Sequence, residues 1–386
     1  MSRIVVLGSG AWGTALALSL HRRGGHQVTL WAHSPEAARE IAEPRENVLF
    51  LPGFPIPPGL VVTGSEAAVA DADIVLSVVA SEFLRSTFAR IRPYLHQGQV
   101  VVSATKGVED HTYLRMTQVI AASLQKAAPQ AAGDIPGARG ASSTSGANSD
   151  ISLEVFSEDS APQVSSSGIA PAPLSFDDLY LPIGALSGPS FALEVAQGQP
   201  TAVTIAFDDA EIAARIQQEF SSPSLRLYTS TDVIGVELGG ALKNVIAIAA
   251  GIAAGVGLGY NSAAALMTRG IAEITRLAVA CGGRRETLAG LSGVGDLVLT
   301  CTGSLSRNRT VGQQLGQGRN LPEILDSLGG KVAEGVRTTR AALGLARRHN
   351  IEMPITEQME LILDEGKDPR EAIRDLMLRP GKHEQH

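Results

Sequence analysis

The sequence predicts an α/β protein, with a doubly wound parallel sheet in its N-terminal part and an all-α C-terminal part. Apolar runs alternate with helical patterns in the first part, and the pattern is helical from Thr231 nearly to the end. A strand–helix alternation of this kind is typical of a doubly wound sheet. We place a first domain at residues 1–230, a second at 231–380, and a short tail at 381–386.

The first strand is predicted by a short continuous apolar run, as expected of a parallel sheet that is buried on both faces. Helical patterns fall between the first four runs, beginning with TALALSLHRRG after the first. Two more strands are expected before the helical part. The six predicted strands lie within residues 3–7, 26–33, 72–81, 99–107, 200–207 and 225–230.

Residues 127–178 differ in character from the rest of the chain. They are rich in Ser, Ala, Pro and Gly and show neither hydrophobic period. Such a segment buries too little apolar area to offset the entropy of ordering. We expect a flexible insertion that projects from the first domain between two ordered elements.

Composition excludes several classes of protein. With 386 residues, 44% of them hydrophobic, and a net charge of -7, the chain is typical of a globular protein and not of a nucleic-acid binder. The longest apolar run, 245–259, is too short and glycine-rich for a membrane span. Cys281 and Cys301 are the only cysteines, which suits a cytoplasmic protein without a metal site. The Ala/Gly-rich helical part is compatible with a homodimer.

A glycine motif, Gly8-Ser9-Gly10-Ala11-Trp12-Gly13, follows the first strand and opens a helix. This is the context of a Rossmann-type dinucleotide site. Gly8 allows the tight turn, Gly10 lets the backbone approach a pyrophosphate, and Gly13 allows close helix–strand packing. The helix N-terminus then favours the negative charge.

The end of the second strand bears on the choice of cofactor. An acid there would bind the ribose 2′-hydroxyl of NAD. The sequence instead has His33 and Ser34, with Arg39 slightly further on. Because no carboxylate repels a 2′-phosphate there, we expect NADPH to be the cofactor, with NADH as the alternative.

Two lysines stand in unusual places. Lys243 is the single lysine of VELGGALKNVIAIAAGIAAG, and Lys106 directly follows the fourth strand. Gly239 and Gly240 share the helix face of Lys243, which suggests close access beside the lysine. A desolvated lysine shifts its pKa readily and suits acid–base chemistry. Each lysine could also be an ordinary surface residue.

The segment LSGVGDLVLTCTGSLSRNRTVGQQLGQG holds further polar candidates. Asp296 and Thr300 are four residues apart and share a helix face. Ser306 is a helix N-cap candidate, and Arg307 beside it offers a bidentate fork to a phosphate monoester. The alternative is a capped surface helix with a solvated arginine.

Together these stretches resemble the bacterial type of NAD(P)-dependent glycerol-3-phosphate dehydrogenase. The matching stretches span residues 4 to about 340, apart from the insertion. They are GSGAWGTALA, WAHS, NVLFLPG, SATKG, LSGPSFA, ELGGALKNVIAIAAGI, LSGVGDLVLTCTGSLSRNR and VAEGVRTT. Position 11 departs from the family, since it is alanine where serine is frequent, and this removes one hydrogen bond to the cofactor.

The resemblance implies roles for individual residues. Lys243 is similar to the general acid/base lysine, and Lys106 to the second lysine, which contacts substrate and cofactor. The remaining catalytic set is Asn244, Asp296 and Thr300. Implied substrate contacts are Lys106, Gly188, Ser190, Lys243, Asp296, Ser306, Arg307 and Asn308. Implied cofactor contacts are Gly8, Gly10, Ala11, Trp12, Gly13, His33, Phe50, Ala192, Arg307, Val332 and Glu334.

The implied reaction is reversible hydride transfer between NAD(P)H and dihydroxyacetone phosphate, giving sn-glycerol 3-phosphate for glycerophospholipid synthesis. Lys243 would exchange the proton on the C2 oxygen, and the glycines beside it would make room for the three-carbon substrate and the nicotinamide ring. Burial and Lys106 would lower its pKa and Asp296 would raise it, so the residues alone leave the direction open. Two alternatives remain: a 6-phosphogluconate or β-hydroxyacid type of dehydrogenase, and a dinucleotide-binding sensor without catalysis.

Overall fold

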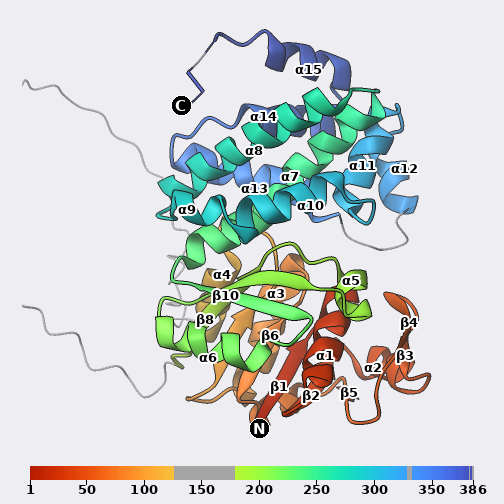
Figure 1. The fold of residues 1–386 in the computed structure, drawn as a ribbon, viewed down its shortest axis with the longest axis vertical. Helices are drawn as coiled ribbons and strands as arrows, with labels where there is room; N and C mark the ends of the chain where they lie inside the picture. The colour runs from red at the N-terminus through yellow and green to blue at the C-terminus, as the bar shows by residue number, and fades with distance from the viewer. Residues whose placement is uncertain (126–178, 328–332, 382, 385–386) are drawn as a thin grey trace, which may run out of the picture. The chain divides into compact units, whose positions relative to one another are not determined.

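The computed structural model describes residues 1–125, 179–327, 333–381 and 383–384 (Figure 1). The expected insertion at 127–178 therefore lies outside the described residues, as do Val332 and half of the expected tail. The described chain contains a sheet with helices on both faces and a C-terminal part built of helices. The predicted fold class is confirmed.

The main sheet has eight strands in the order β10-β9-β8-β7-β6-β1-β2-β5. All six predicted strands are present in it. They are β1 (Ser2–Leu7), β2 (His26–Trp31), β6 (Ile74–Ser77), β7 (Val100–Ser103), β9 (Thr201–Ala206) and β10 (Leu225–Ser230). Because β1 lies between β2 and β6 and runs parallel to both, the chain reverses its winding direction there. Ligands of doubly wound sheets bind outside the carboxyl ends at such a point.

The expectation of a wholly parallel sheet is wrong at one pairing. The strand β8 (Ile183–Ser187) runs parallel to β7 but antiparallel to β9. A buried apolar run has the same composition in either direction, so the sequence pattern does not encode this reversal. Neither β8 itself nor three short strands were predicted: β5 (Val61–Thr63) at the sheet edge and the hairpin of β3 (Glu46–Asn47) and β4 (Leu51–Pro55).

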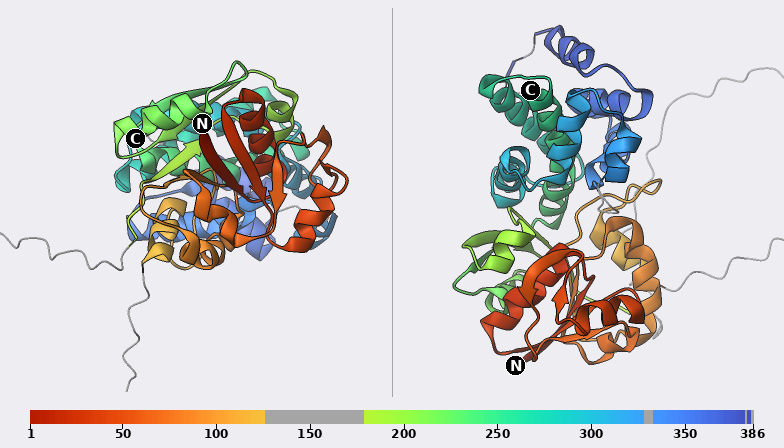
Figure 2. Two further views of the ribbon diagram at one scale, coloured as in Figure 1. Left: turned by 90° about the horizontal axis from the view of Figure 1, so that it is seen from below. Right: turned by 90° about the vertical axis from the view of Figure 1, so that its right-hand side faces the viewer.

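Helices cover both faces of the sheet (Figure 2), and an apolar layer lies between sheet and helices on each face. One face packs against α1 (Ala11–Arg23), α5 (Ala192–Gln197) and α6 (Ala210–Phe220). The other packs against α3 (Ser81–Ile91) and α4 (Met116–Leu124). The remaining helices of this part are α2 (Pro35–Ala42) and the 3₁₀ turns η1 (Glu66–Asp71) and η2 (Arg92–Tyr94).

The helical part is built around α7 (Val233–Gly255), whose residues are buried over nearly their whole length. Its neighbours include α8, α10, α11 and α13 (Figure 1). The bounds are α8 (Tyr260–Ala280), α9 (Arg285–Leu288), a π-helical turn η3 (Leu291–Gly295), α10 (Asp296–Thr302), α11 (Arg307–Gly316), α12 (Leu321–Ser327), α13 (Glu334–Arg348), α14 (Pro354–Glu365) and α15 (Pro369–Met377).

The helix α7 is longer than the apolar run in the sequence suggested. At 23 residues it has the length and composition of a membrane span, but 94% of its most apolar window is buried inside the protein. A bent pair of segments, residues 285–302 with 307–316, passes the same test together. In α7 the apolar surface forms the core of the helical part.

Glycines let α7 and α11 cross with their backbones in contact. A Cβ at Gly312 would lie 1.9 Å from the carbonyl oxygen of Ile248, and one at Gly251 would lie 2.1 Å from that of Arg309. Gly255 and Gly316 continue the same contact one turn further on. The close crossing brings the start of α11 beside the middle of α7, where Lys243 lies.

Candidate active site

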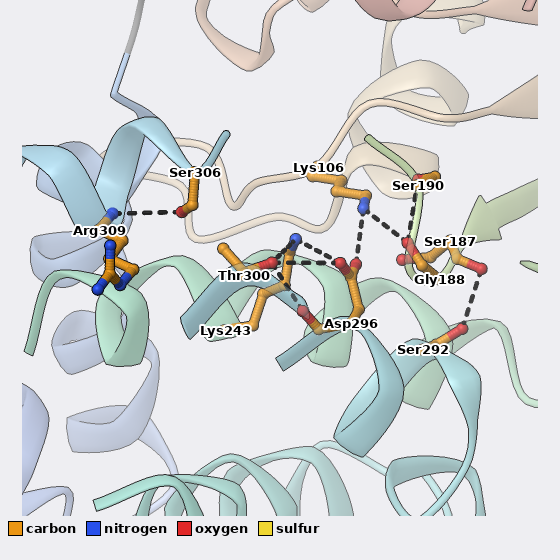
Figure 3. Close-up of polar contacts among 10 residues, drawn as sticks. All are labelled: Lys106, Ser187, Gly188, Ser190, Lys243, Ser292, Asp296, Thr300, Ser306 and Arg309. Carbon is orange, nitrogen blue, oxygen red and sulfur yellow. Dashed lines mark hydrogen bonds and ion pairs between the residues drawn. The ribbon is translucent and has the colours of Figure 1, made fainter. Parts of the chain in front are cut away.

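The candidate site lies where the carboxyl ends of the central strands meet the helical part. Lys106 follows β7 and Gly188 follows β8, so the two come from neighbouring parallel strands. Lys243 approaches from α7, and Asp296 and Thr300 from α10 (Figure 3). Residues far apart in the sequence therefore meet at one place, as the sequence predicted for these positions.

The carboxylate of Asp296 lies between the two lysines. Lys243 Nζ donates to Asp296 Oδ1 at 2.5 Å, and Lys106 Nζ donates to Asp296 Oδ2 at 2.6 Å (Figure 3). Lys106 also donates to the carbonyl oxygen of Gly188 at 3.2 Å, and Ser190 Oγ donates to the same oxygen at 3.0 Å. One buried anion is thus shared by two cations, and the centre keeps a net positive charge when both lysines are protonated.

Burial decides the acid–base character of Lys243. Its side chain is 8% exposed, and burial lowers its pKa from 10.5 to about 8. Asp296 opposes this shift and Lys106 adds to it. The question left open by the residue types is therefore answered: desolvation outweighs the carboxylate, and the lysine titrates near neutral pH.

Thr300 completes the shell around Lys243. Its Oγ1 accepts from Lys243 Nζ at 2.6 Å and donates to the carbonyl oxygen of Asp296 at 2.6 Å. Asp296 and Thr300 stand four residues apart on α10, so the predicted shared face is confirmed. The hydroxyl proton is held by the helix backbone, which leaves the oxygen free to orient the amine.

The expectation that the glycines beside Lys243 make room for substrate is wrong. A Cβ at Gly239 would lie 2.5 Å from the carbonyl oxygen of Ser292, and one at Gly240 would lie 2.2 Å from Ser187 Oγ. The space is filled by η3 and the end of β8. The two glycines instead let these elements pack directly on α7, which brings Gly188 and Lys106 to Lys243.

The candidate phosphate anchor begins α11. Ser306 Oγ accepts from Arg309 N at 3.2 Å, so the predicted N-cap is confirmed. Arg307 is exposed, with no hydrogen-bond partner among the described residues. Asn308 is buried, and its Oδ1 accepts from Gly335 N at 3.0 Å. This bond fixes the amide so that Nδ2 remains a donor.

Gly335 also connects the anchor with the lysine. A Cβ there would lie 2.7 Å from the carbonyl oxygen of Asn244 and 2.8 Å from Asn308 Oδ1. Asn244 is itself buried and follows Lys243 on α7. Glu334, the first residue of α13, is half-buried. Burial raises the pKa of its carboxyl, against the influence of Arg307, Lys106 and Lys243.

The glycine loop has the features needed to hold a dinucleotide pyrophosphate. Gly8 has φ +109°, and a Cβ there would lie 2.8 Å from the carbonyl oxygen of Val78, which follows β6. A Cβ at Gly13 would lie 1.9 Å from Gly8 O, whereas Gly10 faces open space. No side chain caps α1, whose first N–H groups are those of Ala11 and Trp12. These residues fit the cofactor that the motif predicts.

Other expected cofactor residues lie along the same edge of the sheet. His33 follows β2 and is exposed, and Phe50 lies in the β3–β4 hairpin at 38% exposure. Ala192 begins α5 after β8. From β2 to β8 there are four inter-strand spacings, or about 19 Å. His33 at the end of β2 therefore stands about 19 Å from the end of β8, where the lysine centre lies, whereas Ala192 follows β8 closely.

The side chain of Asn47 is a functional candidate that sequence reasoning missed. It is buried, and Nδ2 donates to Ser9 O at 2.7 Å and to Thr14 Oγ1 at 2.8 Å. Its Oδ1 accepts from Phe50 N at 3.2 Å. The hairpin is thereby tied to the glycine loop. The only signal in the sequence was the stretch NVLFLPG, which does not distinguish Asn47 from its neighbours.

Fold and site together are those of a dinucleotide-dependent dehydrogenase, with a buried lysine of lowered pKa beside the carboxyl ends of the strands. Two family models match the chain: the N-terminus of NAD-dependent glycerol-3-phosphate dehydrogenase over residues 3–144 and 175–213, and its C-terminus over 232–374. The chain belongs to this family.

Curated relatives and a solved structure agree with this assignment. A glycerol-3-phosphate dehydrogenase [NAD(P)+] of Acidobacterium capsulatum is 52% identical over 100% of both chains, and one of Koribacter versatilis is 52% identical over 100% and 99%. The crystal structure of glycerol-3-phosphate dehydrogenase from Coxiella burnetii matches 98% of this chain and 99% of its own, with 34% identity and a TM-score of 0.80.

Proposed function

We propose how the residues of this chain carry out the reaction of its family. The protein is an NAD(P)-dependent glycerol-3-phosphate dehydrogenase, which interconverts dihydroxyacetone phosphate and sn-glycerol 3-phosphate. The observation that carries our proposal is the buried Lys243, bonded to Asp296 and Thr300 beside the ends of β7 and β8. It supplies a proton donor with a pKa of about 8 where the substrate would meet the cofactor.

Lys243 moves the proton of the reaction. The bound nicotinamide cofactor supplies a hydride to C2 of dihydroxyacetone phosphate in one direction and accepts it in the other. In reduction, the protonated Nζ of Lys243 polarises the C2 carbonyl and gives its proton to the oxygen. In oxidation, the neutral Nζ takes the proton from the C2 hydroxyl. A donor titrating near the working pH is efficient in both directions.

The other polar residues of the centre orient Lys243 and the substrate. Asp296 and Thr300 hold Nζ through hydrogen bonds of 2.5 and 2.6 Å. Lys106 adds positive charge where the carbonyl oxygen becomes negative, a form of electrostatic stabilisation. We assign Asn244 to the same set, and its burial next to Lys243 on α7, with its carbonyl oxygen beside Gly335, supports this proposal.

The start of α11 is the proposed phosphate site. Arg307 offers a bidentate fork, Asn308 Nδ2 a further donor, and Ser306 begins the helix whose N-terminus favours an anion. Gly188 and Ser190 complete the substrate contacts, since Gly188 O is bonded by both Lys106 and Ser190. Binding of the phosphate at this site then supplies the energy that orients C2 of the substrate.

We assign the cofactor to the carboxyl edge of the sheet. Gly8, Gly10 and Gly13 shape the loop for the pyrophosphate, and NADPH is favoured over NADH because His33 and Ser34 leave no carboxylate at the end of β2. The remaining proposed contacts are Ala11, Trp12, Phe50, Lys106, Ala192, Arg307, Val332 and Glu334.

Several properties of the whole protein belong to the same proposal. We divide the chain into a dinucleotide-binding domain up to residue 230 and a catalytic domain from residue 231, because β10 ends at Ser230 and α7 begins at Val233. We further propose a cytoplasmic homodimer that works toward glycerol 3-phosphate for phospholipid synthesis, because NADPH favours reduction.

The proposal is tested by following absorbance at 340 nm with dihydroxyacetone phosphate and either NADPH or NADH. We expect oxidation of both cofactors, faster with NADPH, and little turnover of dihydroxyacetone, which lacks the phosphate. Faster oxidation of NADH would refute the cofactor preference alone. Equal turnover of dihydroxyacetone would refute the phosphate site at α11.

A further inference from the structure

The loop that follows Lys106 is held in a strained conformation. It runs from Gly107 to Arg115 and is closed at its base by a bridge between Val108 and Arg115. His111 and Tyr113 have backbone φ angles of +67° and +59°, which residues other than glycine rarely adopt. Such conformations persist where surrounding contacts impose them. Arg85 of α3 holds Glu109 of the loop from the sheet part, through hydrogen bonds of 2.8 and 2.7 Å, and two further contacts come from the helical part of the chain.

One contact is made at the tip of the loop. The ring of Tyr113 lies directly on the backbone of α13, where a Cβ at Gly344 would lie 2.2 Å from the ring carbon Cζ. The guanidinium of Arg348 lies 4.4 Å from the centre of the same ring and donates to Thr112 O at 2.9 Å. Tyr113 is thus enclosed between the α13 backbone and a cation.

A second contact is made at the far end of the loop. The buried carboxylate of Glu237 accepts from the guanidinium of Arg115, from Thr117 N at 2.8 Å and from Thr117 Oγ1 at 2.7 Å. Glu237 belongs to α7 and precedes Lys243 by less than two turns. A buried carboxylate with three donors fixes its partners firmly, because losing them would leave the charge unpaired.

The two ends of the loop therefore bond the catalytic centre and the helix that carries its lysine. At its start, Lys106 reaches Asp296, and at its end, Arg115 reaches the helix that carries Lys243. We propose that the loop from Gly107 to Arg115 holds Lys106 in register with Lys243, and that Glu237 and Tyr113 are the positioning residues that fix the loop. This inference rests on the role proposed for Lys106.

The position of Lys106 also bears on the titration of Lys243. Charged groups reach Lys243 from three elements: Asp296 from α10, Glu334 from α13 and Lys106 from the start of the loop. Cys301 of α10 is the remaining titratable neighbour, and burial raises its pKa to about 12. Because Lys106 lowers the pKa of Lys243, a loop that releases Lys106 would let that pKa rise.

The primary test is Glu237→Gln, which keeps the size of the side chain and removes its charge. We expect kcat for dihydroxyacetone phosphate to fall about 10- to 100-fold, as for a small misplacement of a catalytic group. We expect the Kd of NADPH to change much less than kcat, because Lys106 is only one of the proposed cofactor contacts and the glycine loop is not touched. The alkaline limb of the pH–rate profile should move to higher pH.

Glu273→Gln is the matched control for a general loss of stability. Glu273 is also buried and accepts from two backbone N–H groups and a threonine hydroxyl, those of Ile355 and Thr356, but it is not attached to the loop. If Glu237→Gln and Glu273→Gln lose activity equally, and the alkaline limb of the pH–rate profile lies at the same pH in both, the positioning role of Glu237 is refuted. Tyr113→Ala should act like Glu237→Gln, whereas Tyr113→Phe, which keeps the ring, should not.

A readout without turnover separates this inference from the proposed function. Acetylation of Lys106 by acetic anhydride, followed by mass spectrometry, should be faster in Glu237→Gln than in the wild type, because the ion pair with Asp296 is loosened. Unchanged labelling in an active enzyme would refute the positioning role and leave the proposed function intact. Faster labelling of Lys106 in Glu237→Gln, together with a wild type that does not turn over dihydroxyacetone phosphate, would refute the proposed function and leave the positioning of Lys106 intact.

Discussion

At the scale of single residues, one carboxylate organises the catalytic centre. Asp296 is 1% exposed and bonds one lysine through each oxygen. It keeps both cations in a buried place, yet it does not restore the ordinary pKa of Lys243, because desolvation is the larger influence. The centre therefore holds a lysine that can give up its proton near neutral pH.

The titration of Lys243 predicts opposite pH dependences for the two directions. Its pKa is lowered to about 8, so the protonated form needed for reduction is lost as pH rises through that value. We expect kcat/KM for reduction to fall above about pH 8 and that for oxidation to rise, as measured by initial rates in both directions. A limb at the ordinary value for lysine, in either direction, would contradict this.

Asn308 offers a test of the phosphate site that spares the fold. In Asn308→Asp, the carboxylate can still accept from Gly335 N, but the donor Nδ2 is replaced by a negative charge. We expect the KM for dihydroxyacetone phosphate to rise about 10- to 100-fold, the range for losing a hydrogen bond to a charged group.

The control for that change is Asn320→Asp, in which an amide that accepts from Glu323 N is altered in the same way. It should leave KM unchanged. If Asn308→Asp also leaves KM unchanged in a folded protein, then Asn308 serves only to hold α13 and is not a phosphate ligand.

At the scale of elements, the crossing of α7 and α11 decides where the anchor lies relative to Lys243. Both helices carry glycines four residues apart at the crossing, Gly251 and Gly255 on one and Gly312 and Gly316 on the other. Because the two backbones pack directly on each other, no side chain at the crossing could move aside to accommodate an added group.

A methyl group at this crossing should therefore be costly. Gly312→Ala would place a Cβ 1.9 Å from Ile248 O. We expect a loss of about 1–3 kcal/mol in the free energy of unfolding, the usual cost of overpacking. Urea denaturation measures it. Gly259→Ala is the control, because nothing lies within 4 Å of its Cβ; equal losses in the two variants would contradict the packing account.

The elements also mark what could be predicted from the sequence. The strands β1, β6 and β7 were predicted because they are centred on continuous apolar runs, and β2, β9 and β10 were predicted although polar residues interrupt them. The reversed direction of β9 was not predicted, because a buried strand has the same apolar composition whichever way it runs. The hairpin of β3 and β4 is short and largely exposed, so it has no hydrophobic period to detect.

The candidate site was predictable to the extent that its residues sit in distinctive local patterns. Lys243 stands alone in an apolar helix, and Asp296 and Thr300 share a helix face. Asn47 and Glu237 gave no such signal, because an ordinary polar residue becomes important only through the partners that the fold brings to it. The purpose of Gly239 and Gly240 was misjudged for the same reason: the elements that fill their space are distant in sequence.

At the scale of the whole molecule, buried carboxylates join helices to their neighbours. Glu237 connects α7 with α4, and Glu273 of α8 holds the start of α14. Burial raises the pKa of Glu273 to about 7, because desolvation outweighs the hydrogen bonds that oppose it. The folded protein therefore binds a proton at this residue more tightly than the unfolded chain does.

This pKa predicts a pH dependence of stability. The contribution of Glu273 is fully present below its unfolded pKa of 4.5 and is lost as pH rises through about 7. The free energy of unfolding should therefore fall over this interval, and Glu273→Gln should flatten that fall, as measured by urea denaturation at several pH values. A slope that is the same in both proteins would show that Glu273 is not responsible.

The most direct test of the catalytic centre is the rate of NADPH oxidation with dihydroxyacetone phosphate by Lys243→Ala. Lys367→Ala is the control, since Lys367 is also in an ion pair, with Asp375, but outside the site. We predict a loss of about 10²- to 10⁴-fold in kcat for Lys243→Ala, the range for a general acid, with circular dichroism and NADPH affinity preserved. Near-normal turnover by the folded variant would contradict the role of Lys243.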